Sequence, residues 1–150
     1  MKTYNIMLSQ FFPSWHPRTG DKTLFKEHLR QQKLHTIRAN VSHWQGIFKE
    51  IADGEAVLVA RQWIGRPYRS KTFEIARFDA DCGIGLQTLT FEESLYGLHS
   101  INRPLIDGRP IRVELLAAND GLSYEDWASW FQSYDLSEPM AVIQFTNFRY

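Results

Sequence analysis

The chain has 150 residues, 43% hydrophobic and 23% charged, which is typical of one globular domain with a single core. Its formal net charge is zero, which argues against a uniformly basic polyanion binder, and a single cysteine excludes an internal disulfide. The charges are nevertheless divided: residues 1–78 carry 13 Lys and Arg against 6 Asp and Glu, and residues 79–150 carry 4 against 11. One face of the folded chain can therefore be positive despite the neutral total.

No apolar run reaches membrane-spanning length, and the N-terminus lacks an apolar signal core. We therefore expect a cytoplasmic protein without a membrane partner, and the unpaired Cys82 agrees with a reducing compartment. One cysteine and five scattered histidines predict no metal site. The glycine-rich phosphate loops of dinucleotide and nucleotide enzymes are not found, and we predict no cofactor.

The first elements are a strand over residues 3–8, a proline-containing loop, and a helix over residues 22–32 with Asp21 as its N-cap. A second helix is expected to begin at Ser42 and to end at Gly54. The apolar stripe of this second helix, at the spacing of one helical face, consists of Trp44, Ile47, Phe48 and Ile51.

Residues 55–63 predict the next strand, because they form a largely apolar run that ends in a Gly-Arg-Pro turn. Residues 71–78 and 84–91 are expected to pair as a hairpin around the turn residues 79–83. Residues 92–110 contain two glycines and two prolines, which predicts an irregular insertion with at most one short helix.

A strand is expected over residues 111–117, and a third helix begins at Ser123, with Asp126 completing a capping box. Its apolar residues are Trp127, Trp130 and Phe131, which we expect to be core, like Trp44. Residues 140–148 form the last strand. The sequence thus predicts one α+β domain: a small curled β-barrel of about six strands, with helices inserted early and one helix before the final strand.

The strongest functional signal is in residues 33–38, Lys-Leu-His-Thr-Ile-Arg. They place an ammonium (Lys33), a hydroxyl (Thr36) and a guanidinium (Arg38) within six residues. This combination can bind a phosphate or a nucleobase, or carry out acyl transfer, because a hydroxyl becomes a nucleophile when a nearby base accepts its proton.

A second signal is in residues 61–71, which contain four cations, no acid and two aromatic residues. Side chains alternate along a strand, so Arg61 and Trp63 share a face and are expected to flank one cavity. Aromatic rings stack on unpaired bases while cations hold the phosphates, at roughly 1–3 kcal/mol per stacked base. The alternative is a solvated basic loop with Trp63 in the core.

The order of these parts resembles the ASCH family of PUA-like β-barrels. The resemblance rests on residues 33–38, on the turn and strand of residues 54–61, and on residues 119–123, Asn-Asp-Gly-Leu-Ser, which open a late helix. It implies RNA or nucleotide binding in a cleft under the barrel. Some short bacterial members hydrolyse acetylated cytidine, and for that activity the resemblance implies Lys33 as the catalytic lysine and Thr36 as the nucleophile.

In the same comparison Asp120 stands near an acidic position that is usually glutamate, and Glu55, Glu74 and Glu114 remain alternatives for this partner. Structural roles are also open for each residue. Lys33 can be a solvated cation at a helix C-terminus, and Arg38 can pair with Asp120 or Glu114 and close the cleft.

Three functions follow from these observations. The first is binding of RNA or a small modified nucleoside in a cationic, aromatic-flanked cleft. Its ligand-binding residues would be His35, Arg38, Arg61, Trp63, Tyr68, Arg69 and Lys71. The second is an amidohydrolase that removes an acyl group from an acylated cytidine, with Lys33, Thr36 and Asp120 as catalytic residues. The third is a protein-interaction domain. We favour binding, because the acidic partner is not the usual residue and the charge asymmetry fits an anionic ligand.

Overall fold

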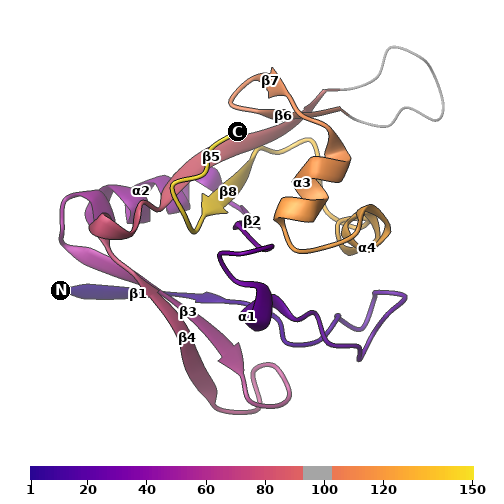
Figure 1. Cartoon of the computed structure of the whole chain (residues 1–150), viewed down its shortest axis with the longest axis horizontal. Coiled ribbons are helices and arrows are strands. Elements are labelled where there is room, and N and C mark those ends of the chain that lie inside the picture. Colours follow the sequence, from indigo (N-terminus) through magenta and orange to yellow (C-terminus); the bar gives the residue numbers. More distant parts are fainter. Residues whose placement is uncertain (93–102) are drawn as a thin grey trace.

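The computed structural model describes residues 1–92 and 103–150, and its α+β class confirms the prediction. Figure 1 shows the elements in chain order. They are β1 (Lys2–Met7), α1 (Phe25–His28), β2 (His35–Ala39), α2 (Val41–Ala52), β3 (Ala56–Trp63), β4 (Thr72–Phe78), a 3-10 turn (Ala80–Cys82), β5 (Gly85–Glu92), β6 (Arg103–Ile106), β7 (Arg109–Pro110), α3 (Val113–Asn119), α4 (Tyr124–Trp130) and β8 (Met140–Gln144).

The strands of the described residues form two sheets, one of three strands in the order β1-β3-β4 and one of five in the order β2-β8-β5-β6-β7. β1 and β3 run parallel, and all other pairs are antiparallel. Figure 1 shows α2 at one end of the sheets and α3 with α4 at the other. These eight strands replace the predicted six, and no closed barrel is detected among the described residues.

The predicted hairpin of residues 71–78 and 84–91 is wrong in its pairing, although both strands exist. β4 pairs with β3, whereas β5 pairs with β6 and β8 in the other sheet. The turn between them is the 3-10 helix, in which the Asp79 carboxylate accepts a hydrogen bond from the backbone N–H of Asp81 at 2.9 Å. This turn carries the chain from one sheet to the other.

The second and third predicted helices are confirmed as α2 and α4. Helix α4 has the predicted cap, with Ser123 Oγ accepting from the Asp126 N–H at 3.1 Å. Helix α2 buries Trp44, Ile47 and Ile51, but its cap is Asn40 and not Ser42. The Asn40 side chain accepts from the His43 N–H at 3.3 Å, and the Ser42 hydroxyl donates to the same oxygen.

Two further predictions of secondary structure are wrong. The predicted helix over residues 22–32 shortens to α1, because Leu24 and Arg30 adopt left-handed backbone angles that a helix cannot contain. Residues 111–117 were expected to form a strand, but helix α3 begins at Val113. Glu, Leu and Ala are strong helix formers, and this preference prevails over the short apolar alternation at the start of the segment.

Within the predicted insertion over residues 92–110, β6 and β7 form a tight hairpin. Ile106 pairs with Arg109, so the turn consists of Asp107 and Gly108, both with positive φ, the typical chemistry of a two-residue hairpin. The part of the insertion over residues 93–102 lies outside the described residues.

The core lies between the sheets and α2, with β3 in the middle of the three-stranded sheet and β8 between β2 and β5 in the other. All five residues of β8 are buried, and so are the first five of β3. Trp44 and Trp127 are core residues as expected, whereas Trp130 is only partly buried. None of the helices in residues 1–92 and 103–150 has the length and hydropathy needed to cross a bilayer.

Candidate functional site

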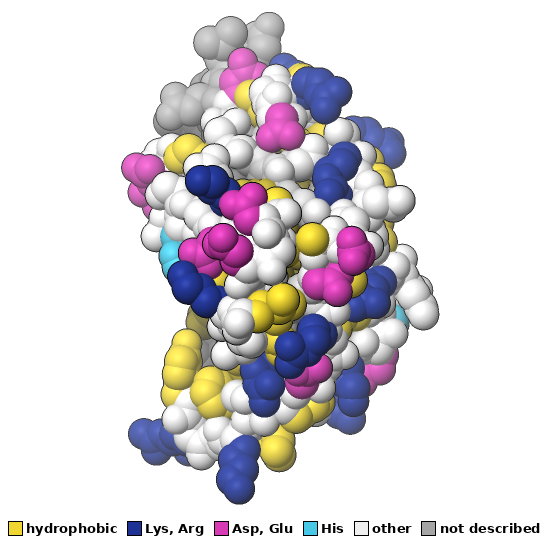
Figure 2. Space-filling view, turned by 90° about the vertical axis from the view of Figure 1, so that its left-hand side faces the viewer, with side chains coloured by type: hydrophobic (Ala, Val, Ile, Leu, Met, Phe, Trp, Pro, Cys, Tyr) yellow, Lys and Arg dark blue, Asp and Glu magenta, His cyan; other side chains and the backbone are white. Residues whose placement is uncertain are grey.

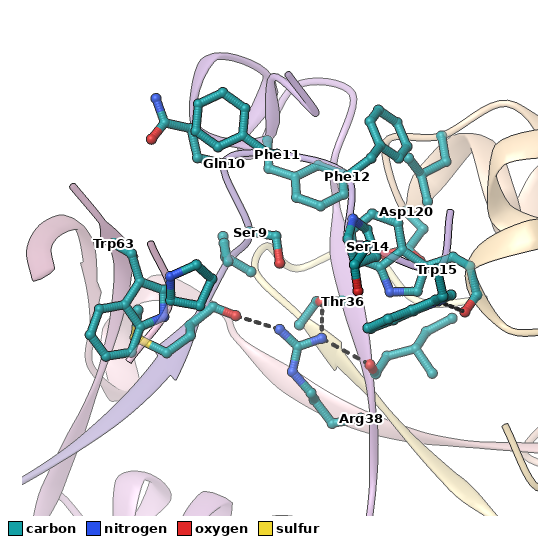
Figure 3. Close-up of a pocket in the computed structure, with 18 of the residues that line it drawn as sticks. Ser9, Gln10, Phe11, Phe12, Ser14, Trp15, Thr36, Arg38, Trp63 and Asp120 are labelled. Carbon is teal, nitrogen blue, oxygen red and sulfur yellow. Dashed lines mark hydrogen bonds between the residues drawn. The ribbon is translucent and has the colours of Figure 1, made fainter. Parts of the chain in front are cut away.

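A large cavity of about 880 Å³ opens where the N-terminal loop, β2, the loop after β3 and α4 meet. Figure 3 shows Thr36 and Arg38 in the middle of this site, with Trp63 on one side and Trp15 and Asp120 on the other. The predicted site residues that line the cavity are Lys33, Thr36, Arg38, Trp63, Tyr68, Arg69 and Asp120. Three others, His35, Arg61 and Lys71, are not among its lining residues.

Strand β2 supplies the floor. Thr36 and Arg38 are two residues apart, so their side chains lie on the same face, and Nη1 of Arg38 donates to the Thr36 hydroxyl at 2.8 Å. Arg38 also donates to the carbonyl of Ile37 at 3.0 Å and, from Nη2, to the carbonyl of Met7 at 2.6 Å. These partners are neutral oxygens, and among the described residues Arg38 forms no ion pair with a carboxylate.

Lys33 and Asp120 form a buried ion pair beside this floor, with 1% and 3% of their surfaces exposed. The ammonium of Lys33 donates to the carboxylate and to the backbone carbonyl of Asp120, each at 2.8 Å. It also lies 3.9 Å from the centre of the Phe25 ring. The alternative of a solvated cation at a helix end is therefore wrong, and Asp120, rather than Glu55, Glu74 or Glu114, is the acidic partner of Lys33.

The backbone brings these two residues together. Lys33 and Asp120 form an isolated antiparallel bridge, and the Leu34 N–H donates to the Asn119 carbonyl at 2.7 Å. Gly121 follows with φ of +81°, and a Cβ at this position would lie 3.0 Å from Cβ of Lys33. The Asn-Asp-Gly turn thus gives Lys33 the space to approach the carboxylate.

Burial and charge act in opposite directions on this pair. Burial lowers the pKa of Lys33, and Asp120 offsets part of that effect. Burial alone would raise the pKa of Asp120, but the Lys33 ammonium and the His35 ring outweigh it and leave the pKa lowered. Each group therefore favours the charged form of the other, but on Lys33 the effect of burial prevails and the pKa remains lowered.

His35 lies on the opposite face of β2 from Thr36 and is completely buried. Its Nε2 lies 2.5 Å from the Tyr150 hydroxyl, which accepts from the Asn119 amide at 3.1 Å. Tyr150 can then donate its own proton to Nε2, which places the imidazole proton on Nδ1, 3.8 Å from the Asp120 carboxylate. Burial lowers the pKa of His35 and raises that of Tyr150, so both are neutral. His35 therefore lies beside Asp120, but its Nδ1 forms no hydrogen bond within the described residues.

Arg61 shares a face with Trp63 as predicted, but its guanidinium turns along the neighbouring strand. It donates to the hydroxyl and the carbonyl of Thr72, at 2.8 and 3.2 Å. Lys71 begins the return of the chain into β4 and is exposed. Neither side chain reaches the cavity wall.

Sequence reasoning missed an aromatic wall that comes from the N-terminal loop, the end of α4 and the residues directly after α4. Its residues are Phe11, Phe12, Trp15, Trp130, Phe131 and Tyr134. The loop is fixed by His16, which is buried and bonded to the Asp126 carbonyl at 2.9 Å, and by Arg18, which pairs with the Asp126 carboxylate at 2.6 Å. The only sequence signal for this wall was a Phe-Phe-Pro-Ser-Trp run in a loop, where aromatic residues have no packing period to explain them.

Cations outnumber carboxylates in the lining of the whole cavity. Its cationic side chains are Lys33, Arg38, Arg66 and Arg69, and its only carboxylate among the described residues is that of Asp120. Because Asp120 is engaged by Lys33, the net charge available to a ligand is positive. No cluster of metal-ligating side chains is found in residues 1–92 and 103–150.

Comparison of the chain with protein-family models, with curated proteins and with solved structures found no match.

Proposed function

We propose that the cavity binds RNA or a modified nucleoside, with an unpaired base between its aromatic walls. One observation carries the proposal: nine aromatic rings and four cations, against one carboxylate, line a single cavity in the described part of the chain. Rings stack on unpaired bases, and arginine and lysine hold phosphates. A ligand that is both aromatic and anionic matches this wall.

The floor of the cavity supports the same proposal. Arg38 donates three of its five N–H groups, to Thr36, Ile37 and Met7. The remaining N–H groups can bind an oxygen of the ligand. The Thr36 hydroxyl accepts from Arg38 and keeps its own proton to donate. Since the Asp120 carboxylate is occupied by Lys33, the floor favours a base edge or a phosphate that offers acceptors.

We further propose that the two sheets represent a PUA-like arrangement of the ASCH family and that the protein works in the cytoplasm. The contact of Lys33 with Asp120 supports the family proposal, because it joins two of the three segments on which the resemblance rests. The exposed, unpaired Cys82 is consistent with a reducing compartment.

Fluorescence anisotropy with 5′-labelled single-stranded octacytidylate at low salt tests the binding proposal. Replacing Trp63 by alanine removes a stacking ring and is expected to weaken binding by about 1–3 kcal/mol, whereas Trp63→Phe keeps most of the affinity. Arg112→Ala serves as a matched control, because Arg112 is exposed and lies outside the cavity. If the wild-type protein shows no association at low salt, the binding proposal is wrong.

The contact between Lys33 and Asp120 favours a second candidate function, hydrolysis of an acylated cytidine. In this reaction the Thr36 oxygen attacks the acyl carbon, the amine leaves with a proton, and water then hydrolyses the resulting ester. Lys33 can accept the Thr36 proton only as a neutral amine, which its burial favours and Asp120 opposes. Arg38 would stabilise the deprotonated Thr36 oxygen to which it already donates.

Release of cytidine and acetate from N4-acetylcytidine measures this activity. Thr36→Ala is expected to abolish turnover and to leave nucleoside binding nearly intact, and Thr36→Ser should recover part of the turnover because it restores the hydroxyl. Turnover by Thr36→Ala at the wild-type rate would rule out Thr36 as the nucleophile.

A further inference from the structure

The loop between β3 and β4 lies at the mouth of the cavity and is held in its conformation by hydrogen bonds. It follows Trp63, the last residue of β3, and is closed by a hydrogen bond from the Ile64 N–H to the Lys71 carbonyl at 2.8 Å. Inside it, the Ser70 hydroxyl accepts from the Gly65 N–H at 3.0 Å and donates to the Arg66 carbonyl at 2.8 Å. One serine thus fixes both arms of the loop.

This loop presents Tyr68 to solvent at an energetic cost. Tyr68 is 90% exposed, and its φ of +63° lies in the left-handed region, which a bulky residue rarely adopts. Its ring lies 5.3 Å from that of Trp63, tilted by 50°. Strained residues persist where the surrounding structure holds them, often at ligand sites, and this one keeps an aromatic ring uncovered beside the cavity.

The same loop carries two arginines that are not paired with a carboxylate of the described residues. Arg66 and Arg69 line the cavity mouth, and neither forms an ion pair with a carboxylate of the described residues. In Figure 2, Lys and Arg side chains project from the lower end of the molecule, where the loop lies in Figure 1, next to hydrophobic atoms. The loop therefore combines a stacking ring with free cations.

This mouth is separated from the floor by more than the width of one base. The Met7 carbonyl, which binds Arg38, belongs to a residue paired with Arg61, and Trp63 is two residues further along β3, about 7 Å at the usual rise of a strand. The centre of the Tyr68 ring lies 5.3 Å from that of the Trp63 ring. The cavity of about 880 Å³ is also near the upper end of ligand pockets, which span roughly 300–1,000 Å³.

Building on the proposed function, we propose that the β3–β4 loop is a second base-binding position and that the natural ligand is a single strand of two or more nucleotides, not a free nucleoside. One base lies on the floor beside Thr36 and Arg38. The next base stacks on Tyr68, and the phosphate between the two is held by Arg66 and Arg69.

Calorimetric titration with cytidine, with the dinucleotide CpC and with octacytidylate tests this proposal. The wild-type protein should bind CpC at least about ten-fold more tightly than cytidine, because the dinucleotide gains one stacked base and one phosphate contact. Tyr68→Ala should remove most of this advantage by weakening CpC far more than cytidine, and Tyr68→Phe should restore it. Tyr124→Ala is the matched control, since Tyr124 is exposed and lies outside the cavity.

The arginines have a separate readout. Arg66→Ala and Arg69→Ala should each flatten the salt dependence of octacytidylate binding by about 0.7 in the slope of log K against log salt, and Arg112→Ala should leave the slope unchanged. Both arginines are exposed, and circular dichroism of each variant verifies the fold.

The possible outcomes separate this inference from the proposed function. If cytidine and CpC bind equally well, or if Tyr68→Ala weakens both equally, the second position does not exist, although nucleoside binding stands. If neither the monomer nor the strands bind the wild-type protein, the proposed function fails as well.

Discussion

At the scale of single residues, the central feature is a lysine ammonium placed in the interior of a small domain. Removing an ion from water costs several kcal/mol, so Lys33 is tolerable only with a close counter-charge and further hydrogen bonds. Asp120 supplies both a carboxylate and a carbonyl at 2.8 Å, and the Phe25 ring covers a further side of the ammonium. Any variant that removes one partner leaves the other charge buried and unpaired.

The pair predicts a specific pH dependence of stability. Because the pKa of Asp120 is lower in the folded state than in the unfolded chain, its carboxylate stabilises the fold above the unfolded pKa, about 3.9, and this contribution is lost as the pH falls through the folded pKa. Urea unfolding should show that Asp120→Asn is less stable by about 3–5 kcal/mol at pH 7 and loses less stability below pH ~4 than the wild type.

The control for this experiment is Asp53→Asn, an exposed acid at the end of α2. It should keep the wild-type dependence on pH. Parallel curves for the wild type and Asp120→Asn would show that the ion pair contributes nothing to acid stability.

At the scale of elements, α2 begins after Asn40, which both caps the helix and adopts a left-handed backbone conformation. Asn40 caps the helix and also has φ of +69°, an angle that asparagine adopts more readily than alanine. Asn40→Ala should therefore lose the cap and incur backbone strain, about 2 kcal/mol in all, whereas Asn40→Gly should cost only a few tenths of a kcal/mol. Chemical denaturation of the two variants measures the difference.

Ser42, the cap expected from the sequence, provides the comparison. Its hydroxyl only donates to the Asn40 side chain, and Ser42→Ala should change the free energy of unfolding by less than about 0.5 kcal/mol. A larger loss from Ser42→Ala than from Asn40→Ala would reverse this assignment of the cap.

Local patterns were sufficient for two of the helices. The stripe from Trp44 to Ile51 predicted α2, and the Ser123 capping box predicted α4. Pairing between distant strands was not predictable, because β4 and β5 carry equally good strand patterns for either sheet. The first helix was predicted too long, because the pattern of residues 22–32 gave no sign of the left-handed angles at Leu24 and Arg30. The Arg30 N–H donates to the Lys33 carbonyl at 2.9 Å instead of continuing a helix.

The site was predictable to a similar extent. Residues 33–38 and 61–71 stood out by charge and chemistry, and both contribute to the cavity wall. Which of these side chains reach the cavity was not predicted. Residues 35–39 form the strand β2, which places His35 on the face opposite Thr36, and the Arg61 guanidinium is bonded to Thr72. The aromatic wall around Trp15 was not predicted, because loop residues show no hydrophobic periodicity.

At the scale of the whole molecule, the charges that line the cavity follow the division of charge along the chain. All four of its cations come from the first 78 residues, and its one acid comes from the second half. The wall joins segments that are far apart in sequence, the N-terminal loop, β2, the β3–β4 loop and α4. A ligand in contact with all of them must stabilise the folded state as a whole.

Thermal unfolding tests this consequence. Octacytidylate at about 100 times its dissociation constant should raise the free energy of unfolding by about 2.7 kcal/mol and the melting temperature by roughly 5–10 °C. At the same oligonucleotide concentration, Trp63→Ala should show a clearly smaller rise. An equal rise in both proteins would place the oligonucleotide elsewhere on the surface.

Arg38 also connects the two sheets. It belongs to β2 in the five-stranded sheet and donates to the carbonyl of Met7, which belongs to β1 in the three-stranded sheet. Under the proposed function, a ligand bound to the remaining N–H donors of Arg38 acts on a side chain that is bonded to both sheets. Binding that is tighter at one separation of the sheets than at another would favour that separation, because linkage is reciprocal.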